Sequence, residues 1–449
     1  MTSLLPGSHF PAAPPSRRRR SGRSLPRSAA FWVVAGTTTA LIAAAAAPSP
    51  LYPVYQAEFH FSALTLTAVF AVYVFALLLS LLTIGRLSDF LGRRPVLAVA
   101  LLVEAGAMAV FLDAHGVAAL FVARIVQGLA TGAALGDLGA YLLDLQPANG
   151  SRLGSLVNSA ATPAGFGLGA ALAGVLIQYA PHPTRLIFAI LAVAFVALAL
   201  ITAVMPETVT RKPGSLAALR PQVSVPASAR RPFLRAVPTT ASTFMLAGWM
   251  FSIGGSLLTV VFGQTNHAIV GLVLGLFAGS GAVAAVVLRG QTPETMTRAG
   301  ITGMFVGTVL FALALAASSL PIFVVGAVIA GAAYGLGFLG PFQSLSPLAQ
   351  PHERAALISA FYVVAYLAFS IPALVAGLLI TDVGLRSTSL GYDTIVALVV
   401  AGTALYEIRA ARRTLGRLRR DGTDRSPAQP ADCAPAGARL RSLTQREWW

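Results

Sequence analysis

Long apolar runs alternate with short polar stretches along most of the chain. Each run holds about twenty residues with few charges, the length that an α-helix needs to cross a bilayer. We expect twelve membrane-spanning helices, at about residues 30–50, 63–84, 95–113, 117–143, 154–178, 184–204, 238–262, 268–288, 299–317, 321–348, 355–380 and 390–409. The pattern therefore predicts an all-α membrane protein.

Three stretches lack this apolar pattern. Residues 1–28 are rich in Pro, Ser and Arg, and we expect them to form a disordered, basic cytoplasmic arm. This arm and the apolar run after it also imitate a secretory signal, but the run is long enough to span and many spans follow. Residues 206–237 read as a cytoplasmic linker, and residues 411–449 as a basic cytoplasmic tail.

The linker divides the chain into two six-helix bundles, 29–205 and 238–410, and an internal repeat supports this division. A triad between the second and third helix of the first half recurs with the same spacing in the second half: Gly85, Asp89 and Arg93 correspond to Gly290, Glu294 and Arg298. In such a duplication the two halves have the same order and direction of helices. We predict two bundles of the same orientation in the membrane.

Charge and composition agree with this picture. The chain is 56% hydrophobic and 11% charged, with a formal net charge of +16. The arginines cluster in the loops of one side, as the positive-inside rule requires, so we place both termini in the cytoplasm and the protein in the plasma membrane. The same distribution argues against nucleic acid as a partner. The sequence therefore predicts that the lipid bilayer surrounds the protein.

Several kinds of chemistry find no support in the sequence. Cys433 is the single cysteine, so no disulfide forms within one chain. The six histidines lack metal-site spacing, and neither a phosphate-binding loop nor a nucleophile elbow is present. We therefore expect no metal, no cofactor and no enzymatic activity.

The turn between the second and third spans carries the most specific motif. It runs Gly-Arg-Leu-Ser-Asp-Phe-Leu-Gly-Arg-Arg-Pro-Val-Leu from residue 85 to 97. The string resembles the signature loop of the major facilitator superfamily, and the matching positions are Gly85, Asp89, Gly92, Arg93 and Arg94. The resemblance implies a secondary transporter that works by alternating access, with a small-molecule substrate held between the two bundles.

Residues 124–132 resemble a second motif of that family, in which an arginine precedes Gln-Gly inside the fourth helix. The resemblance implies a role in proton coupling for Arg124, although a snorkelling or structurally paired arginine is the alternative. Glu104 lies at a similar depth and can pair with Arg124, or else lie on a peripheral face or in a purely structural pair. Asp137 is a second candidate for the titrating group.

Asp144 ends the fourth span at the level of the signature loop. By the resemblance it joins Asp89 and Arg93 in a charge network that gates the cytoplasmic side and latches the outward-open state, whereas a solvated cap is the simpler alternative. The fifth helix departs from the antiporter pattern, because Gly169 is followed by Ala170 and the proline lies at Pro163. This departure weakens the assignment as an exporter.

Aromatic and amide side chains are candidates for the wall of a central cavity. We name Tyr73, Asn158, Trp249, Tyr334, Phe338, Gln343, Tyr362 and Tyr366. Such walls suit apolar or weakly cationic compounds, although packing or interfacial anchoring explains many of these residues equally well. We place no acid inside the first helix or the C-terminal bundle, which leaves proton coupling to the N-terminal half.

These observations favour proton-coupled efflux of drug-like, apolar or cationic compounds by a monomer. The first alternative is a proton-coupled symporter that imports a small nutrient such as a sugar or an organic acid. An alternative of another class is a receptor of the same fold that does not transport. The direction of accumulation separates the first two, and binding without proton-linked flux identifies the third.

Overall fold

The computed structural model describes residues 25–147, 153–211, 223–350 and 353–423, with the single positions 213, 219 and 221 between them. Most of the predicted N-terminal arm therefore lies outside the described residues. The same holds for the predicted tail beyond residue 423, including Cys433.

The N-terminal half is built from six long helices and two short ones. Its elements are α1 (Arg27–Ala46), the 3-10 turn η1 (Ser49–Leu51), α2 (Tyr52–Phe59), α3 (Ala63–Thr83), α4 (Ser88–Leu91), α5 (Arg93–Leu112), α6 (Val117–Leu145), α7 (Leu153–Tyr179) and α8 (Leu186–Ala203). α1, η1 and α2 together form the first span, because the chain continues almost without a break from Arg27 to Phe59.

The C-terminal half repeats this plan with six long helices. Its elements are α10 (Ala227–Ser256), the π-helical turn η2 (Leu257–Val261), α11 (His267–Val287), α12 (Pro293–Ala317), α13 (Leu320–Leu345), the 3-10 turn η3 (Ser346–Leu348), α14 (Arg354–Val383) and α15 (Leu385–Thr423). Side chains that begin helices explain some of these boundaries. Ser62, Asn266 and Thr292 each accept a hydrogen bond from a backbone N–H in the first turn that follows.

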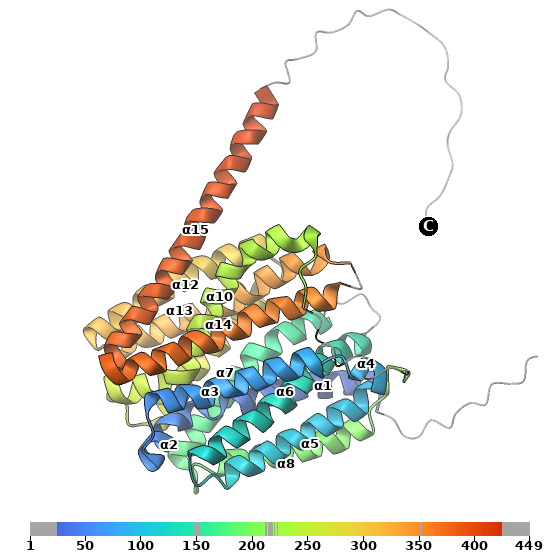
Figure 1. The fold of residues 1–449 in the computed structure, drawn as a ribbon, viewed down its shortest axis with the longest axis vertical. Helices are drawn as coiled ribbons and strands as arrows, with labels where there is room; N and C mark the ends of the chain where they lie inside the picture. Colours follow the sequence, from blue (N-terminus) through green and yellow to red (C-terminus); the bar gives the residue numbers. More distant parts are fainter. Residues whose placement is uncertain are drawn as a thin grey trace, which may run out of the picture. The chain divides into compact units, whose positions relative to one another are not determined.

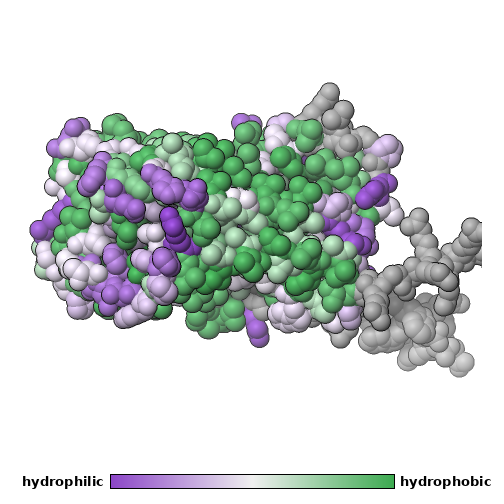
Figure 2. Space-filling model, turned by 90° about the horizontal axis from the view of Figure 1, so that it is seen from below, coloured by the Kyte–Doolittle hydropathy of each residue, from purple (hydrophilic) through white to green (hydrophobic). Residues whose placement is uncertain are grey.

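Twelve helices of the described chain are long and apolar enough to cross a membrane. This confirms the predicted fold class and the predicted number of spans. Large apolar side chains on the outer surface, such as Val193 and Val287 at 71% exposure, belong on a face that meets lipid rather than water. Figure 2 shows hydrophobic side chains across the middle of one face and hydrophilic ones gathered toward its two ends.

One helix begins earlier than the sequence pattern predicts. α10 starts at Ala227 and contains Pro232 and Pro238, whereas we expected a linker up to residue 237. Proline is unfavourable in a helix interior, but packing against neighbouring helices compensates for it. Here Ala229 and Phe233 are buried in an apolar cluster with Leu357 and its neighbours, and this tertiary packing extends the helix into the predicted linker.

The helices alternate in direction, so the two ends of the bundle can be named. The basic end is where α3 ends and α5 begins, beside Arg86, Arg93 and Arg94. The far end is where α2 ends and α3 begins. Figure 1 shows α4 at the basic end and α2 at the opposite one, with α3 running between them beside α6 and α14.

Candidate functional site

At the basic end, the signature turn forms a tight corner between α4 and α5. Gly92 adopts φ +101°, a conformation that side chains disfavour, and a Cβ there would lie 2.7 Å from Oε2 of Glu207. The corner also sets Asp89 and Arg93 one helical turn apart, and Nη1 of Arg93 lies 2.8 Å from Oδ1 of Asp89.

Arg93 reaches from this corner to α6. Its Nη1 lies 3.5 Å from Oδ1 of Asp137 and its Nε lies 3.3 Å from Oδ2 of Asp144, and it also donates to Oγ of Ser88 at 2.7 Å. The Arg93 side chain is 8% exposed and that of Asp137 is fully buried. The structure thus brings Asp89, Arg93 and Asp144 together and adds Asp137 to them.

Glu207 is a member of this site that the sequence analysis missed. Its carboxylate accepts hydrogen bonds from the backbone N–H of Arg93 at 2.9 Å and of Arg94 at 3.2 Å, at the N-terminus of α5. A carboxylate at this position also complements the helix dipole. The Arg94 side chain donates to the carbonyl oxygen of Ala203 at the end of α8. No sequence pattern marks Glu207, because it follows the last span of the half in an irregular stretch.

These residues form what we call the basic-end network: Ser88, Asp89, Arg93, Arg94, Asp137, Asp144 and Glu207. Thr208 donates to Oδ2 of Asp144 at 2.8 Å, and Arg27 of α1 donates to the backbone carbonyl of Asp144. These contacts join elements of the N-terminal half to one another and to the start of the predicted linker, residues 207 and 208. In the described residues the network therefore ties α1, α4, α5, α6 and the end of α8 together, and its role in gating stays a prediction.

A second polar cluster lies deep inside the N-terminal half, around the fully buried Arg124 of α6. Its guanidinium donates to the hydroxyl of Tyr52 at 2.6 and 3.2 Å, to Oε1 of Gln127 at 2.7 Å and to the carbonyl oxygen of Ala45 at 3.1 Å. It also lies 5.0 Å from the ring centroid of Tyr73. A buried cation is costly unless it is hydrogen-bonded, and here neutral partners from α1, α2 and α3 surround it.

Glu104 joins the same cluster through Gln127. The amide of Gln127 donates to Oε1 of Glu104 at 3.2 Å, and the Thr131 hydroxyl donates to Oε2 at 3.2 Å. All three side chains are fully buried. We call Tyr52, Glu104, Arg124, Gln127 and Thr131 the midplane network.

This arrangement changes the predicted pairing. Within the described residues, Glu104 and Arg124 form no ion pair within 4.0 Å, because Gln127 lies between them. Asp137 lies about 20 Å from Arg124 along α6, at a rise of 1.5 Å per residue, and belongs to the basic-end network. Gln127 follows Arg124 by three positions in the quoted motif, so helical spacing alone would have brought it to this side of α6.

Four of the predicted cavity residues converge in the C-terminal half. The rings of Tyr334, Phe338 and Tyr366 lie 5.9, 5.6 and 6.3 Å from the ring of Phe244, and Tyr362 stacks on Tyr366 at 5.8 Å. We call these five residues, with Phe369, the aromatic cluster. Phe369 lies 6.1 Å from Phe244 and 5.1 Å from Phe70 of the N-terminal half, so the cluster meets the boundary between the bundles.

In the described residues, none of the remaining predicted cavity residues makes a ring contact with this cluster. Tyr73 packs on Arg124, Asn158 is half-buried on α7 near Gly139, and Gln343 is half-buried near the basic end of α13. Trp249 is fully buried within the C-terminal bundle, where its ring lies 5.4 Å from that of Phe311. This packing gives no support to a place for Trp249 on the cavity wall.

One expectation is wrong: an acid does lie inside the C-terminal bundle. Asp393 of α15 is 1% exposed, and its position inside the predicted span 390–409 was readable from the sequence.

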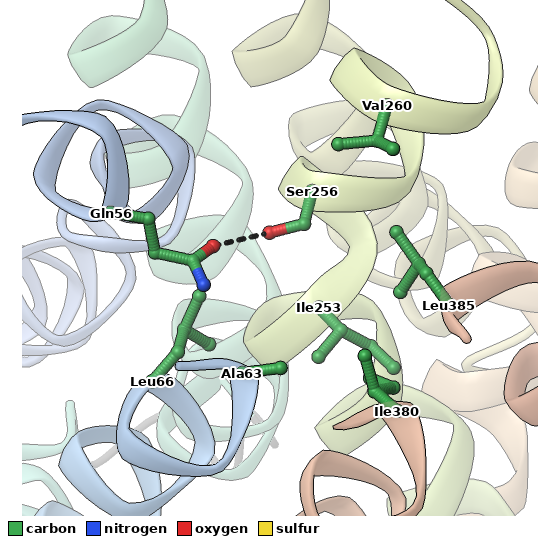
Figure 3. A pocket seen from close by; sticks show the side chains of 8 residues that line it. All are labelled: Gln56, Ala63, Leu66, Ile253, Ser256, Val260, Ile380 and Leu385. Atoms are coloured by element: carbon green, nitrogen blue, oxygen red, sulfur yellow. Dashed lines mark hydrogen bonds between the residues drawn. The ribbon is translucent and has the colours of Figure 1, made fainter. Parts of the chain in front are cut away.

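The two halves touch from mid-depth to the far end. α7 and α11 approach so closely that a Cβ on Gly174 would lie 2.6 Å from Cα of Gly271. Near the far end, Gln178 accepts from the backbone N–H of His267 at 2.9 Å. The hydroxyl of Ser256 donates to Gln56 at 3.1 Å beside a cavity of about 220 Å³ (Figure 3). Every hydrogen bond between the halves in the described residues lies at this end.

Comparisons with known proteins agree with this architecture. An uncharacterized transporter of Rickettsia bellii is 31% identical over 141 residues, a match that covers 31% of this chain and 34% of that protein, about a third of its length. The crystal structure of the human organic anion transporter MFSD10 (TETRAN) has a TM-score of 0.61 and 17% identity, covering 84% of this chain and all of that one.

A bacterial homolog of the human lysosomal transporter Spinster, in an inward-facing and occupied conformation, has a TM-score of 0.66 and 12% identity. The match covers 84% of this chain and 96% of that one. The family described as Major Facilitator Superfamily matches residues 34–292, more than half of the chain. With twelve spans in two six-helix halves and this match, the chain belongs to the Major Facilitator Superfamily and is a membrane transporter of that family.

Proposed function

We propose that the protein exports apolar or weakly cationic compounds in exchange for protons. The observation that carries this proposal is the midplane network, in which the buried carboxyl of Glu104 is linked through Gln127 to the buried guanidinium of Arg124. Charged side chains at this depth in a membrane are retained for function more often than for stability. The network supplies one group that can carry a proton and one fixed positive charge beside it.

Coupling needs a carboxyl whose affinity for protons differs between the two end states of transport. In this state, among the residues that the structure describes, Glu104 accepts only from the neutral donors Gln127 and Thr131. A small shift of α6 against α5 would alter the distance between Glu104 and Arg124, and a nearby charge changes the proton affinity of a carboxyl. Arg124 therefore acts as the moving charge, and Gln127 as the link between the two.

The aromatic cluster supports the choice of substrate. It presents the rings of Phe244, Tyr334, Phe338, Tyr362 and Tyr366 close to the boundary between the halves, and none of these side chains carries a fixed charge. Aromatic faces bind apolar surfaces and attract cations. Such a wall selects compounds by shape and aromatic contact rather than by a counter-ion.

One observation favours the alternative of proton-coupled import of a small nutrient. α7 lacks the Gly-Pro pair expected of an antiporter, since Ala170 follows Gly169 and Pro163 lies earlier in the helix. An importer moves the compound in the same direction as the proton, and an exporter moves it in the opposite direction. One measurement of the direction of accumulation therefore distinguishes them.

The test uses inside-out membrane vesicles, a fluorescent cationic compound and an imposed pH gradient. A difference of one pH unit stores about 1.4 kcal/mol per proton, which supports about a tenfold concentration ratio for exchange of one proton. We expect wild-type vesicles that are acidic inside to accumulate the compound to about this ratio. Accumulation of the compound in vesicles that are alkaline inside, and not in those that are acidic inside, would identify an importer instead.

Variants test the residues. Glu104→Gln and Arg124→Ala should abolish accumulation and leave downhill movement measurable, whereas Arg124→Lys should retain part of it if charge alone matters. Glu58→Gln is the matched control, because Glu58 is an exposed glutamate at the end of α2. If correctly inserted Arg124→Ala still concentrates the compound with an unchanged dependence on pH, Arg124 is structural and the coupling proposal is wrong.

A further inference from the structure

Asp393 lies in the part of α15 that packs inside the C-terminal half, whereas the midplane network lies in the N-terminal half. The neighbouring Tyr392 fixes this segment, because its hydroxyl donates to the carbonyl oxygen of Met245 at 2.7 Å and its ring stacks on Trp249 at 6.3 Å. One end of α15 is held as well, since Arg386 donates to the carbonyl oxygen of Ala316 at 2.9 Å. α15 is thus packed against α10 beside Asp393, and against α12 near its own first turn.

Three polar side chains of this segment are buried without hydrogen-bond partners in the described residues. Neither carboxyl oxygen of Asp393 makes a hydrogen bond within the described residues, and the same holds for the hydroxyls of Thr388 and Ser389. These three residues are 1%, 7% and 0% exposed, respectively. Ser389 precedes Asp393 by one helical turn, so both side chains lie on one face of α15. The indole N–H of Trp249 also lacks a partner.

In the described parts of α10, α12 and α15, no charged side chain compensates Asp393. α10 carries no ionisable residue between Thr239 and Ser256, and α12 carries none between Ala299 and Ala317. On α15 itself, Tyr392 donates to Met245 and Arg386 is engaged by Ala316, and the next charged residue is Glu407. Within the described residues Asp393 has no ion pair.

An ionised carboxylate is unstable in such surroundings unless a cation neutralises it. The available ligands are oxygen atoms alone, with no imidazole or thiol among them, and such a set suits a proton or a hard cation rather than a transition metal. We propose that Asp393, with the hydroxyl of Ser389 one turn away, binds a small monovalent cation, a proton or a sodium ion. This site is separate from Glu104 and does not depend on proton coupling through that residue.

The experiment measures binding rather than transport, so its failure is distinct from a failure of the proposed function. The full chain carrying Glu104→Gln, which removes the other acid buried at mid-depth, is purified in lipid nanodiscs. Binding of radioactive sodium is measured in sodium chloride against choline chloride at equal ionic strength. Infrared difference spectra recorded across a pH change report the carbonyl band of a protonated carboxyl.

If the ion is sodium, we expect saturable sodium binding that Asp393→Asn abolishes and Ser389→Ala weakens. If the ion is a proton, we expect a carbonyl band that Asp393→Asn removes and Ser389→Ala shifts. Asp382→Asn is the matched control and should change neither signal, because Asp382 is an exposed carboxyl at the end of α14.

The measurement on the protein with Asp393 intact remains decisive even where Asp393→Asn folds poorly. Absence of both sodium binding and a protonated carbonyl band in that protein overturns the proposal. Signals that persist unchanged in well-folded Asp393→Asn overturn it as well.

Discussion

At the residue scale, Arg93 is the one cation among the described residues that reaches the fully buried Asp137, while Asp144 lies at the edge of the same network with 35% of its side chain exposed. Removing Arg93 leaves a buried carboxylate without its charge partner, a loss of about 3–5 kcal/mol in comparable cases. Removing the exposed carboxylate costs about 1 kcal/mol or less. The contact of Arg93 with Asp137 therefore contributes more to stability than its contact with Asp144.

We predict that Arg93→Ala destabilises the purified protein far more than Asp144→Ala does, and that adding Asp137→Asn to Arg93→Ala restores much of the loss. Thermal unfolding in detergent measures this, with Arg86→Ala as the control from the same turn. A double-mutant cycle between Arg93 and Asp144, in transport as well as stability, tests the proposed latch. No coupling in either measurement removes Asp144 from it.

Much of this site was predictable residue by residue, and the exceptions have physical reasons. The signature loop predicted Asp89 and Arg93, and the sequence also placed Glu104 at a depth similar to that of Arg124. Gln127 was missed because a pair of opposite charges suggests a direct contact, whereas the packing admits an amide between them. Glu207 was missed because an irregular stretch has no periodicity from which to place a side chain.

At the scale of elements, α7 and α11 form one of the close contacts between the two halves. A Cβ on Gly275 would lie 2.8 Å from the carbonyl oxygen of Gly167 and 2.9 Å from Cβ of Ala171, so a neighbour would have to move. A Cβ on Gly279 of the same helix meets nothing within 4 Å.

We predict that Gly275→Ala destabilises the protein by about 1–3 kcal/mol relative to Gly279→Ala, because overpacking a close interface costs about this much. The two variants share the same change in helix propensity, so their difference in unfolding temperature isolates the contact. Transport by Gly275→Ala should also slow. Equal unfolding temperatures would show that the two helices do not touch in this way in the membrane.

The sequence predicted the helices far better than their ends. Twelve apolar runs gave twelve spans, because the bilayer fixes both their length and their composition. The start of α10 was misplaced, since packing of Phe233 in an apolar cluster outweighs the two prolines that mark a break in the sequence.

At the scale of the whole molecule, the basic residues define one end of the bundle, and we propose that this end faces the cytoplasm. In a Cys433→Ser background, we predict that cysteines introduced at His60 and Asp382, both exposed at the far end, react with an impermeant thiol reagent in intact cells. A cysteine at Gln291, exposed at the basic end, should react only after permeabilisation. Labelling of Gln291→Cys in intact cells would show that the basic end faces the outside, the opposite of the proposed orientation.

The contacts between the two halves could not be predicted from the sequence. The sequence does not indicate which helix packs against the glycines of the fifth span, and only the fold pairs Gly174 with Gly271. The far-end contact between Gln56 and Ser256 joins residues 200 positions apart in the chain. Such contacts depend on which conformation of the transporter is considered, and a single sequence encodes all of them.

The midplane network and the aromatic cluster lie in different halves of a duplicated chain, and this separation bears on how such a protein changes over generations. A ring replaced on α10, α13 or α14 alters the aromatic surface, while the hydrogen bonds around Arg124 on α6 stay intact. If the midplane network couples protons and the aromatic cluster binds the substrate, as we propose, selection can preserve the N-terminal half while the C-terminal half changes. Adaptation to unfamiliar compounds would then require few mutations, and we expect those mutations in the C-terminal half.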